Sequence, residues 1–272
     1  MKKKKIGIVG CGAIGSSLAK FIDRELSDKA ELKAICDLDP SKANALKDSL
    51  NKSKPTVTSL DNLIKVSDLV IESASAKISY EIAKRAIARR KSILVMSIGG
   101  IISKFDELFD LARKKKCFIY LPSGAICGID ALKALSLAGI EKVTLTTSKP
   151  PNALKGADYI TKNKIDLDKI DKETVIFEGS ALDAVRDFPQ NINVAALLSI
   201  AGIGAKNTKV KIVTSPSYKE NSHEVEIVSK AGTIRTISQN VPFKENPKTS
   251  YLAALSAMSV LKGIFDSARV GS

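Results

Sequence analysis

Hydrophobic residues in the first 121 positions follow two alternating spacings. Short apolar runs, which are typical of buried strands, occupy residues 5–9, 31–36, 68–74, 92–97 and 117–121. Between them, apolar residues recur every three or four positions, which predicts helices at 14–26, 41–51, 78–90 and 105–116. Alternating strands and helices favour right-handed crossovers, so this region is predicted to form an α/β fold, a Rossmann-type doubly wound parallel sheet.

The pattern changes after Pro122. A helix is predicted at 128–138, and the strand-like runs that follow lie at 142–147, 174–177, 209–214 and 224–228, separated by turn residues. We therefore expect a second, α+β domain over 122–243. A last helix at 249–265 is too short to form a domain and is expected to pack on the first one. The first domain is thus expected to comprise 1–121 plus 244–272.

Three glycines follow the first predicted strand and open the first predicted helix. Gly10, Gly12 and Gly15 have the spacing G-x-G-x-x-G. Gly10 allows a tight turn, Gly12 lets the backbone approach a pyrophosphate, and Gly15 lets the helix pack closely on the sheet. The helix start, with Ala13 and Ile14, offers backbone N–H groups and a positive dipole end to the phosphates. This context predicts a dinucleotide site.

A carboxylate at the end of the second apolar run supports the same conclusion. Asp37 lies 22 residues after Gly15 and can accept hydrogen bonds from a ribose 2′-OH. It would repel a 2′-phosphate, which favours NAD over NADP. Lys42 lies five residues further on and could neutralise such a phosphate. The expected cofactor is therefore NAD or NADP, with the preference open.

Charge and composition restrict the other possibilities. The chain carries 43 Lys and Arg against 29 Asp and Glu, for a formal net charge of +14. These basic residues are spread along the sequence and there is no Trp, so we interpret the charge as solvated surface and expect no specific nucleic-acid partner.

Neither a metal site nor a membrane segment is indicated. The four cysteines show no C-x-x-C spacing and have no histidine nearby, so no metal is expected. The longest apolar stretch, 194–205, is too short and too glycine-rich to span a bilayer. With no recognisable signal peptide, the protein is expected to be cytoplasmic and not to bind membranes.

One histidine and several strand-end loops are candidates for chemistry. His223 is the chain's only histidine, so imidazole acid–base chemistry has a single candidate. A surface histidine without a role is the alternative. The loops at 72–75, 97–100 and 122–125 follow predicted strands, and ligands bind at such carboxyl ends. Asn191 and Asn193 belong to an amide-rich stretch before an apolar helix, where they serve either as helix caps or as ligand contacts.

Together these segments resemble the L-aspartate dehydrogenase family. The most specific are Pro-Ser-Gly-Ala at 122–125, Phe-Pro-Gln-Asn-x-Asn-Val-Ala-Ala at 188–196 and Asn-x-His-Glu at 221–224. The resemblance runs from the first strand to the last helix, over 6–15, 72–75, 96–99, 121–131, 149–151, 188–196, 223–226 and 246–256.

The resemblance implies NAD(P)-dependent oxidation of L-aspartate to iminoaspartate. This imine hydrolyses to oxaloacetate and ammonia or feeds quinolinate and NAD biosynthesis. The second domain should then resemble that of dihydrodipicolinate reductase. The family's active-site histidine corresponds to His223, and its cofactor contacts to Ala125 and Asn191. Two residues of the 72–75 loop, Ser73 and Ala74, are expected to contact the cofactor as well.

The resemblance also suggests which residues contact the substrate. Two substrate carboxylates need cationic or N–H partners, for which Lys149 and Asn193 are candidates. Ser73 and Ser148 stand where many relatives have Cys and Arg, so position 148 offers no cationic clamp.

A homodimer is expected. The alternatives are an enzyme like dihydrodipicolinate reductase or homoserine dehydrogenase, and a nucleotide-sensing protein without catalysis.

Overall fold

The computed structural model describes residues 3–188, 193–268 and 270, with Pro247 and Lys248 described only in their backbone. The described chain divides into two compact units. The first comprises residues up to 122 together with 254–268, and the second comprises residues within 123–253. The expected boundary at 243/244 thus differs from the observed one at 253/254, which leaves residues 244–253, including the first three residues of the last helix, with the second unit.

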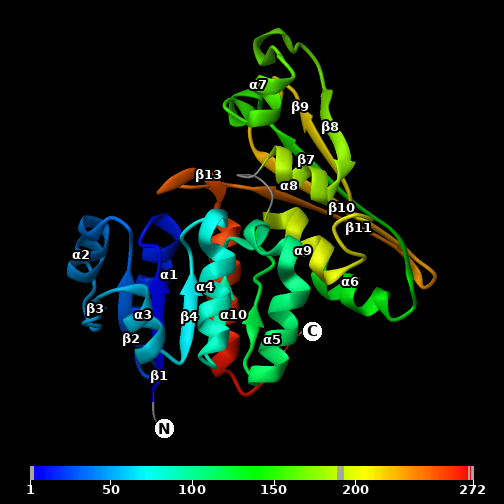
Figure 1. Cartoon of the computed structure of the whole chain (residues 1–272). Coiled ribbons are helices and arrows are strands. Elements are labelled where there is room, and N and C mark those ends of the chain that lie inside the picture. The colour runs from blue at the N-terminus through cyan, green and yellow to red at the C-terminus, as the bar shows by residue number, and fades with distance from the viewer. Residues whose placement is uncertain (1–2, 189–192, 269, 271–272) are drawn as a thin grey trace. The chain divides into compact units, whose positions relative to one another are not determined.

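The first unit is built on a six-stranded parallel sheet in the order β3-β2-β1-β4-β5-β6 (Figure 1). This is the strand order of a dinucleotide-binding Rossmann sheet, and its topological switch point lies between β1 and β4. The strands are β1 (Lys4–Val9), β2 (Ala30–Cys36), β3 (Thr56–Val57), β4 (Leu69–Glu72), β5 (Ser92–Val95) and β6 (Ile119–Tyr120).

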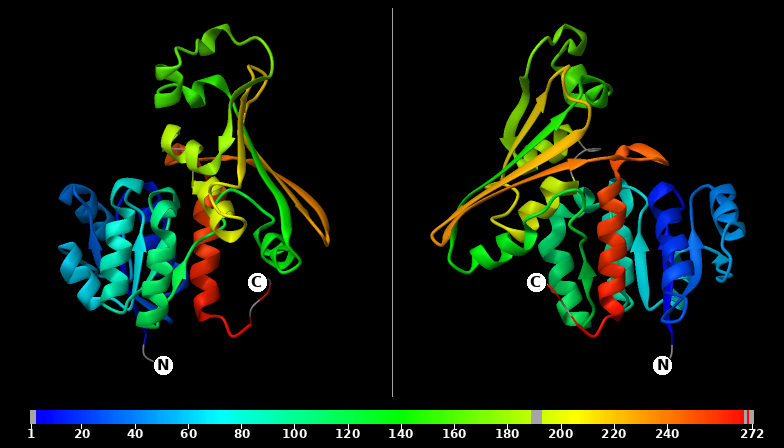
Figure 2. Two further views of the ribbon diagram at one scale, coloured as in Figure 1. Left: turned by 45° about the vertical axis from the view of Figure 1, so that its right-hand side comes forward. Right: turned by 180° about the vertical axis from the view of Figure 1, so that it is seen from behind.

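Helices cover both faces of this sheet (Figure 2). Apolar side chains of α1, α2 and α10, among them Leu18, Leu46 and Leu261, contribute to a core on one face. Helices α3, α4 and α5 lie on the other face. The bounds are α1 (Ala13–Glu25), α2 (Pro40–Asp48), α3 (Leu60–Val66), α4 (Ala76–Ala88), α5 (Phe105–Lys115) and α10 (Tyr251–Phe265). The last helix packs on this unit as its sequence predicted.

The second unit contains a five-stranded mixed sheet in the order β11-β10-β7-β9-β8. Strands β7 and β9 are parallel, and the other neighbours are antiparallel. The strands are β7 (Ile140–Lys149), β8 (Thr174–Ser180), β9 (Lys209–Thr214), β10 (Asn221–Ser229) and β11 (Gly232–Asn240); a separate small pair is formed by β12 (Pro242–Phe243) and β13 (Asn246–Ser250). This confirms the expected α+β architecture.

Helices cover one face of the second sheet (Figure 1). Polar side chains such as Lys142, Thr144 and Glu226 lie on the other face. The covering elements are α6 (Ile129–Ser136), η3 (Pro151–Leu154), α7 (Asp158–Lys162), η4 (Leu167–Lys169), α8 (Ala181–Asp187) and α9 (Asn193–Ala201). Along β7 the inward side chains are Val143, Leu145, Thr147 and Lys149, because successive residues of a strand point to opposite faces. The apolar series therefore ends in two polar residues at the carboxyl end of β7.

The sequence pattern did not indicate several short or polar elements. Strand β3 has two residues and α3 has seven, too few for a periodic signal. Strand β11 is an edge strand with only two strongly apolar residues, Ile234 and Ile237, so its sequence resembles a loop. Among the described residues, no helix combines the length and apolar character needed to cross a bilayer.

Candidate active site

The glycine turn after β1 leaves an open space beside its second glycine. Gly10 has a φ of +94°, and a Cβ there would lie 2.5 Å from the carbonyl oxygen of Ser73. A Cβ on Gly15 would collide with the carbonyl oxygen of Gly10. By contrast, no described residue other than its chain neighbours places an atom within 4 Å of the Cβ position of Gly12. The first and third glycines are thus required by the fold, whereas Gly12 keeps space free for a ligand.

Helix α1 begins directly after Gly12 and presents its positive end to that space. No side chain caps it, and its first turn has no acidic residue. The backbone N–H groups of Ala13 and Ile14 lie in this first turn, where N–H groups have no partner within a helix. A helix start of this kind binds phosphate groups through N–H donors and the helix dipole. The turn therefore fits a dinucleotide pyrophosphate.

Asp37 follows β2 and binds the glycine turn. Its Oδ2 accepts a hydrogen bond of 2.6 Å from the backbone N–H of Cys11, and its Oδ1 accepts one of 2.9 Å from the N–H of Asp39. Each carboxylate oxygen can accept more than one hydrogen bond, so a ribose hydroxyl can still bind. Asp37 thus has a second role that the sequence did not indicate, which is to fix the turn.

The loop after β4 is also tied to the glycine turn. Ser73 Oγ donates to the carbonyl of Gly10 at 2.9 Å, and the N–H of Ala74 donates to Glu72 Oε1 at 2.9 Å. Glu72 is fully buried and also accepts hydrogen bonds from the N–H and hydroxyl of Ser97, at 3.0 and 2.9 Å. Burial raises the pKa of this carboxyl. Glu72 therefore connects the loops after β4 and β5. The sequence shows only that a charged residue follows an apolar run, and it does not reveal this connection.

In the second unit, His223 is buried and hydrogen-bonded. It lies on β10 directly opposite Thr147 of β7, and 3.0 Å separate His223 Nδ1 from Thr147 Oγ1. Only 5% of His223 is exposed, so it is not a surface histidine. Burial, together with the nearby charge of Lys149, lowers its pKa to about 3. The imidazole is therefore neutral at neutral pH, whereas an unperturbed histidine would titrate near it.

Lys149 lies on the same inward face, two residues beyond Thr147. Its residue surface is 6% exposed, and burial lowers its pKa to about 8. Its neighbour across the sheet is Thr214 of β9, whose hydroxyl donates to the Lys149 carbonyl at 2.7 Å. The structure thus brings together two of the predicted residues, His223 and Lys149, and adds Thr147 to them.

The loop that contains Ala125 is anchored by β11. The carbonyl oxygen of Ala125 accepts hydrogen bonds from Ser238 Oγ at 2.8 Å and from Asn240 Nδ2 at 3.0 Å. Ser238 is also paired with His223 across β10 and β11. Sequence reasoning missed both anchoring residues because β11 itself was not predicted. The Ala125 loop and the His223 strand are therefore connected to the same edge strand.

Two other predicted contacts are less constrained by the structure. Asn191 lies outside the described residues. Asn193 is the first residue of α9, and its side chain is exposed. No group of three or more His, Cys, Asp or Glu side chains within the described ranges is placed to hold a metal ion.

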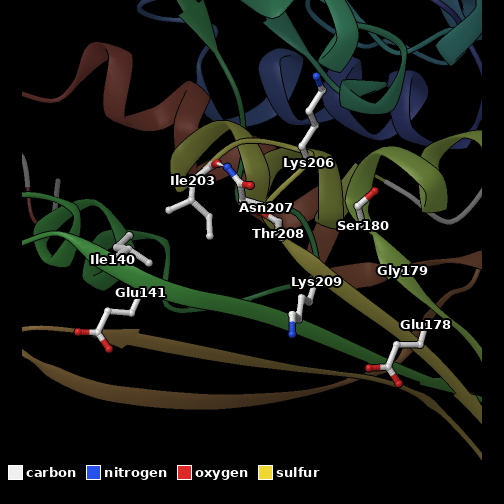
Figure 3. Close-up of a pocket in the computed structure, with 10 residues that line it drawn as sticks. All are labelled: Ile140, Glu141, Glu178, Gly179, Ser180, Ile203, Lys206, Asn207, Thr208 and Lys209. Atoms are coloured by element: carbon white, nitrogen blue, oxygen red, sulfur yellow. Dashed lines mark hydrogen bonds between the residues drawn. The ribbon is translucent and has the colours of Figure 1, made fainter.

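A cavity of about 590 Å³ lies elsewhere on the second unit (Figure 3). It is next to Ile140 and Glu141 at the start of β7, whereas Thr147 and Lys149 lie near the end of that strand. Its charged lining mixes Glu141 and Glu178 with Lys206 and Lys209. The predicted site residues do not line it, so it is separate from the candidate active site.

Comparison with known proteins assigns the chain to a family. The family model "Aspartate dehydrogenase, C-terminal" matches residues 130–264, and the model "Homoserine dehydrogenase, NAD binding domain" matches residues 10–122. An L-aspartate dehydrogenase of Methanosarcina mazei is 46% identical over 270 residues, which cover 98% of this chain and 99% of that protein. One of Methanocaldococcus jannaschii is 42% identical over 271 residues, with the same two coverages.

The chain belongs to the L-aspartate dehydrogenase family. An aspartate dehydrogenase structure from Thermotoga maritima matches with a TM-score of 0.74 and 23% identity, covering 99% of this chain and 100% of that one. A homoserine dehydrogenase structure from Thiobacillus denitrificans matches with a TM-score of 0.62 and 16% identity, covering 96% and 73%. At these identities the structural matches establish the fold, and they confirm the Rossmann-type unit joined to a second unit.

Family membership and the glycine turn agree on the cofactor. The matched NAD-binding region contains the turn, the start of α1 and Asp37. The first unit is therefore a dinucleotide-binding domain, and the cofactor is NAD or NADP. The region matched by the aspartate dehydrogenase model contains Thr147, Lys149 and His223.

Proposed function

We propose that this protein oxidises L-aspartate to iminoaspartate, with NAD or NADP as the hydride acceptor. The observation that supports this most directly is the buried pair of His223 and Thr147 with Lys149 on the same sheet face. It occurs in a chain whose relatives, matched over nearly their full length, are L-aspartate dehydrogenases. The imine then hydrolyses to oxaloacetate and ammonia or is used in quinolinate and NAD biosynthesis.

The first unit holds the cofactor in this proposal. The N–H groups of Ala13, Ile14 and Gly15 bind the pyrophosphate beside the open space at Gly12. Asp37 accepts a hydrogen bond from a ribose hydroxyl in one nucleotide of the cofactor. The Ser73–Ala74 loop, which Glu72 fixes, contacts the other nucleotide of the cofactor. When bound, the oxidised nicotinamide supplies the two-electron acceptor for the hydride.

Residues of the second unit bind and orient the amino acid. His223 is the proposed catalytic residue, because its second ring nitrogen, Nε2, can contact the substrate amine while Nδ1 is held by Thr147. Asn193 provides N–H donors for a substrate carboxylate, and Lys149, on the same sheet face as His223, is the second proposed substrate contact. Ala125 and Asn191 are the proposed further cofactor contacts, and Ser238 and Asn240 fix the carbonyl of Ala125.

The state of the protein in the cell is also a proposal. We expect a cytoplasmic homodimer. The edge strand β11, with Ile237 61% exposed and Val241 beyond it 64% exposed, supports association, because unpaired strand edges with apolar side chains pair readily. The molar mass of the purified protein by light scattering tests this; a value near the 29.1 kDa of one chain would contradict it.

The activity itself is tested with purified protein. L-Aspartate is supplied with NAD+ or NADP+, and the absorbance of the reduced cofactor is followed while oxaloacetate and ammonia are assayed. We expect equal amounts of reduced cofactor and ammonia. Homoserine and dihydrodipicolinate with the appropriate cofactor form serve as the alternative substrates. NADH binding without turnover of any of them would favour a nucleotide-sensing protein.

A further inference from the structure

The inward face of the second sheet ends in a row of polar residues. Thr147 of β7 is opposite His223 of β10, and Lys149 lies two residues further along β7 on the same face. The preceding inward residues of β7, Val143 and Leu145, are fully apolar and buried. Two groups that can exchange protons are thus placed side by side at the end of an apolar face.

The small cavity beside Lys149 has a largely apolar lining. The side chains lining the small cavity beside it are Leu145, Leu154, Ala195, Val210 and Ile212, with Thr147 as the polar exception. From β10 the titratable group facing it is His223. η3, α9 and β9 contribute no carboxylate to the lining of that cavity among the described residues. Burial accordingly lowers the pKa of Lys149 to about 8, so a substantial fraction is neutral in mildly alkaline solution.

The proposed reaction requires a group of this kind. Hydride can leave Cα only after the substrate ammonium has lost a proton, because the nitrogen lone pair must form the C=N bond. His223 is a weak base here, since burial and the neighbouring Lys149 disfavour its protonated form. A neutral primary amine is a much stronger base than this imidazole.

We propose that the neutral amine of Lys149 takes the proton that the substrate ammonium loses before hydride transfer. This inference rests on the proposed function. The N–H bond of the substrate breaks and its proton forms a fourth bond to Lys149 Nζ. The Cα–H bond then breaks with its electron pair passing to the nicotinamide, while the nitrogen lone pair forms the imine. Aspartate is oxidised by two electrons, the cofactor is reduced by two, and Lys149 later returns its proton to water.

His223 has a different role in this scheme. Its Nδ1 is engaged with Thr147, and its Nε2 orients the substrate amine without being protonated. These separate roles predict that the pH dependence of kcat/KM in the mildly alkaline range arises from the titration of Lys149. A simple carboxylate clamp would require the opposite, because a clamp must be charged and would lose activity as pH rises through the pKa of Lys149.

The test is the pH dependence of kcat/KM for aspartate between pH 6 and 9. In the wild type we expect a roughly tenfold rise per pH unit that levels off near pH 8. Lys149→Met and Lys149→Arg should both lose about 10²–10⁴-fold and lack this rise. His223→Gln should be slower but keep the rise. Lys142→Met is the matched control, because Lys142 is on the same strand but points to the exposed face, where it pairs with Glu226.

A second variant keeps the test decisive if Arg does not fit the site. In Lys149→Ala, added ethylamine should restore activity, and more basic amines should restore more at equal concentrations of free base. NADH binding should be unchanged in every variant. Activity and pH profile retained in Lys149→Arg, or a rise retained in Lys149→Met, would overturn the inference while leaving the proposed function intact. A wild type that produces no NADH from aspartate would instead contradict the proposed function and, with it, this inference.

Discussion

His223 and Thr147 face each other across β10 and β7, with 3.0 Å between Nδ1 and Oγ1. The contact fixes one ring nitrogen and leaves Nε2 as the nitrogen available to a substrate. Because the pair is buried, the imidazole stays neutral well below its usual pKa. The chain's only histidine is therefore held in one orientation and one charge state before any ligand binds.

The charge of Lys149 gives a stability prediction that does not depend on activity. Its folded-state pKa of about 8 lies below the ordinary 10.5, so burial penalises the charged form. This penalty is fully present below pH 8 and disappears as pH rises from 8 to 10.5. We expect Lys149→Met to raise the free energy of unfolding at pH 7 by about 3 kcal/mol, at about 1.4 kcal/mol per unit of pKa shift.

Chemical denaturation at pH 7 and pH 10 measures this effect. The wild type should gain stability between the two pH values, and Lys149→Met should gain less. Lys142→Met again serves as the control, because Lys142 is 45% exposed in its side chain. A Lys149→Met variant less stable than the wild type at pH 7 would show that the buried amine is stabilised by its surroundings.

Asp37 should distinguish the two cofactors. Asp37→Ala removes an acceptor for the ribose hydroxyl and also releases the N–H of Cys11, so NAD binding should weaken by about 1.5–3 kcal/mol. NADP should be affected less, because the same change removes a repulsive charge. KM values for both cofactors measure this. Asp39→Ala is the control in the same loop, since Asp39 caps α2 through Ser41. Equal changes in both KM values would refute the ribose assignment.

A side chain at position 12 should prevent cofactor binding without preventing folding. Apart from its chain neighbours, the described residues leave its Cβ position open to 4 Å, so Gly12→Val should fold with a melting temperature close to that of the wild type. The added methyl groups would fill the space assigned to the pyrophosphate, and NADH titration should detect no binding. Gly263→Ala, at another open position, is the control and should bind normally. Normal NADH affinity in Gly12→Val would place the cofactor elsewhere.

Asn240 should affect the cofactor through Ala125. Its Nδ2 donates to the carbonyls of Ala125 and Ser238, at 3.0 and 3.4 Å, so a carboxylate in Asn240→Asp would face two carbonyl oxygens. We expect the KM for the cofactor to rise about tenfold, equivalent to about 1.4 kcal/mol. Asn207→Asp is the matched control, because Asn207 donates to a carbonyl at an exposed position. An unchanged KM for the cofactor in Asn240→Asp would show that the hydrogen bond from Asn240 to Ala125 does not contribute to cofactor binding.

Local signals were sufficient to predict the dinucleotide-binding domain. The glycines directly follow the first strand, and Asp37 comes after the next helix and strand. Each of these features can be recognised from its own short stretch of sequence. The helix at 249–265 was also correctly expected to pack on the first unit, because one helix is too short to form a domain of its own.

Contacts between distant segments could not be predicted in the same way. Thr147 and His223 are 76 residues apart, and Asn240 and Ala125 are 115 apart. Their pairing depends on strand register, which the pattern of apolar residues leaves undetermined for a polar edge strand such as β11. The burial of His223, which lowers the pKa of its imidazole, also depends on that register.

The most direct test of the whole account is kcat for L-aspartate oxidation in the wild type and in His223→Ala, with NADH titrations and melting temperatures alongside. We predict that the wild type reduces its cofactor with aspartate. The variant should lose about 10²-fold in kcat, because the substrate amine is no longer oriented, while binding NADH with unchanged affinity. If kcat of the variant stays within a few-fold of the wild type, or falls only together with the melting temperature, His223 has no part in the chemistry and the proposed site is wrong.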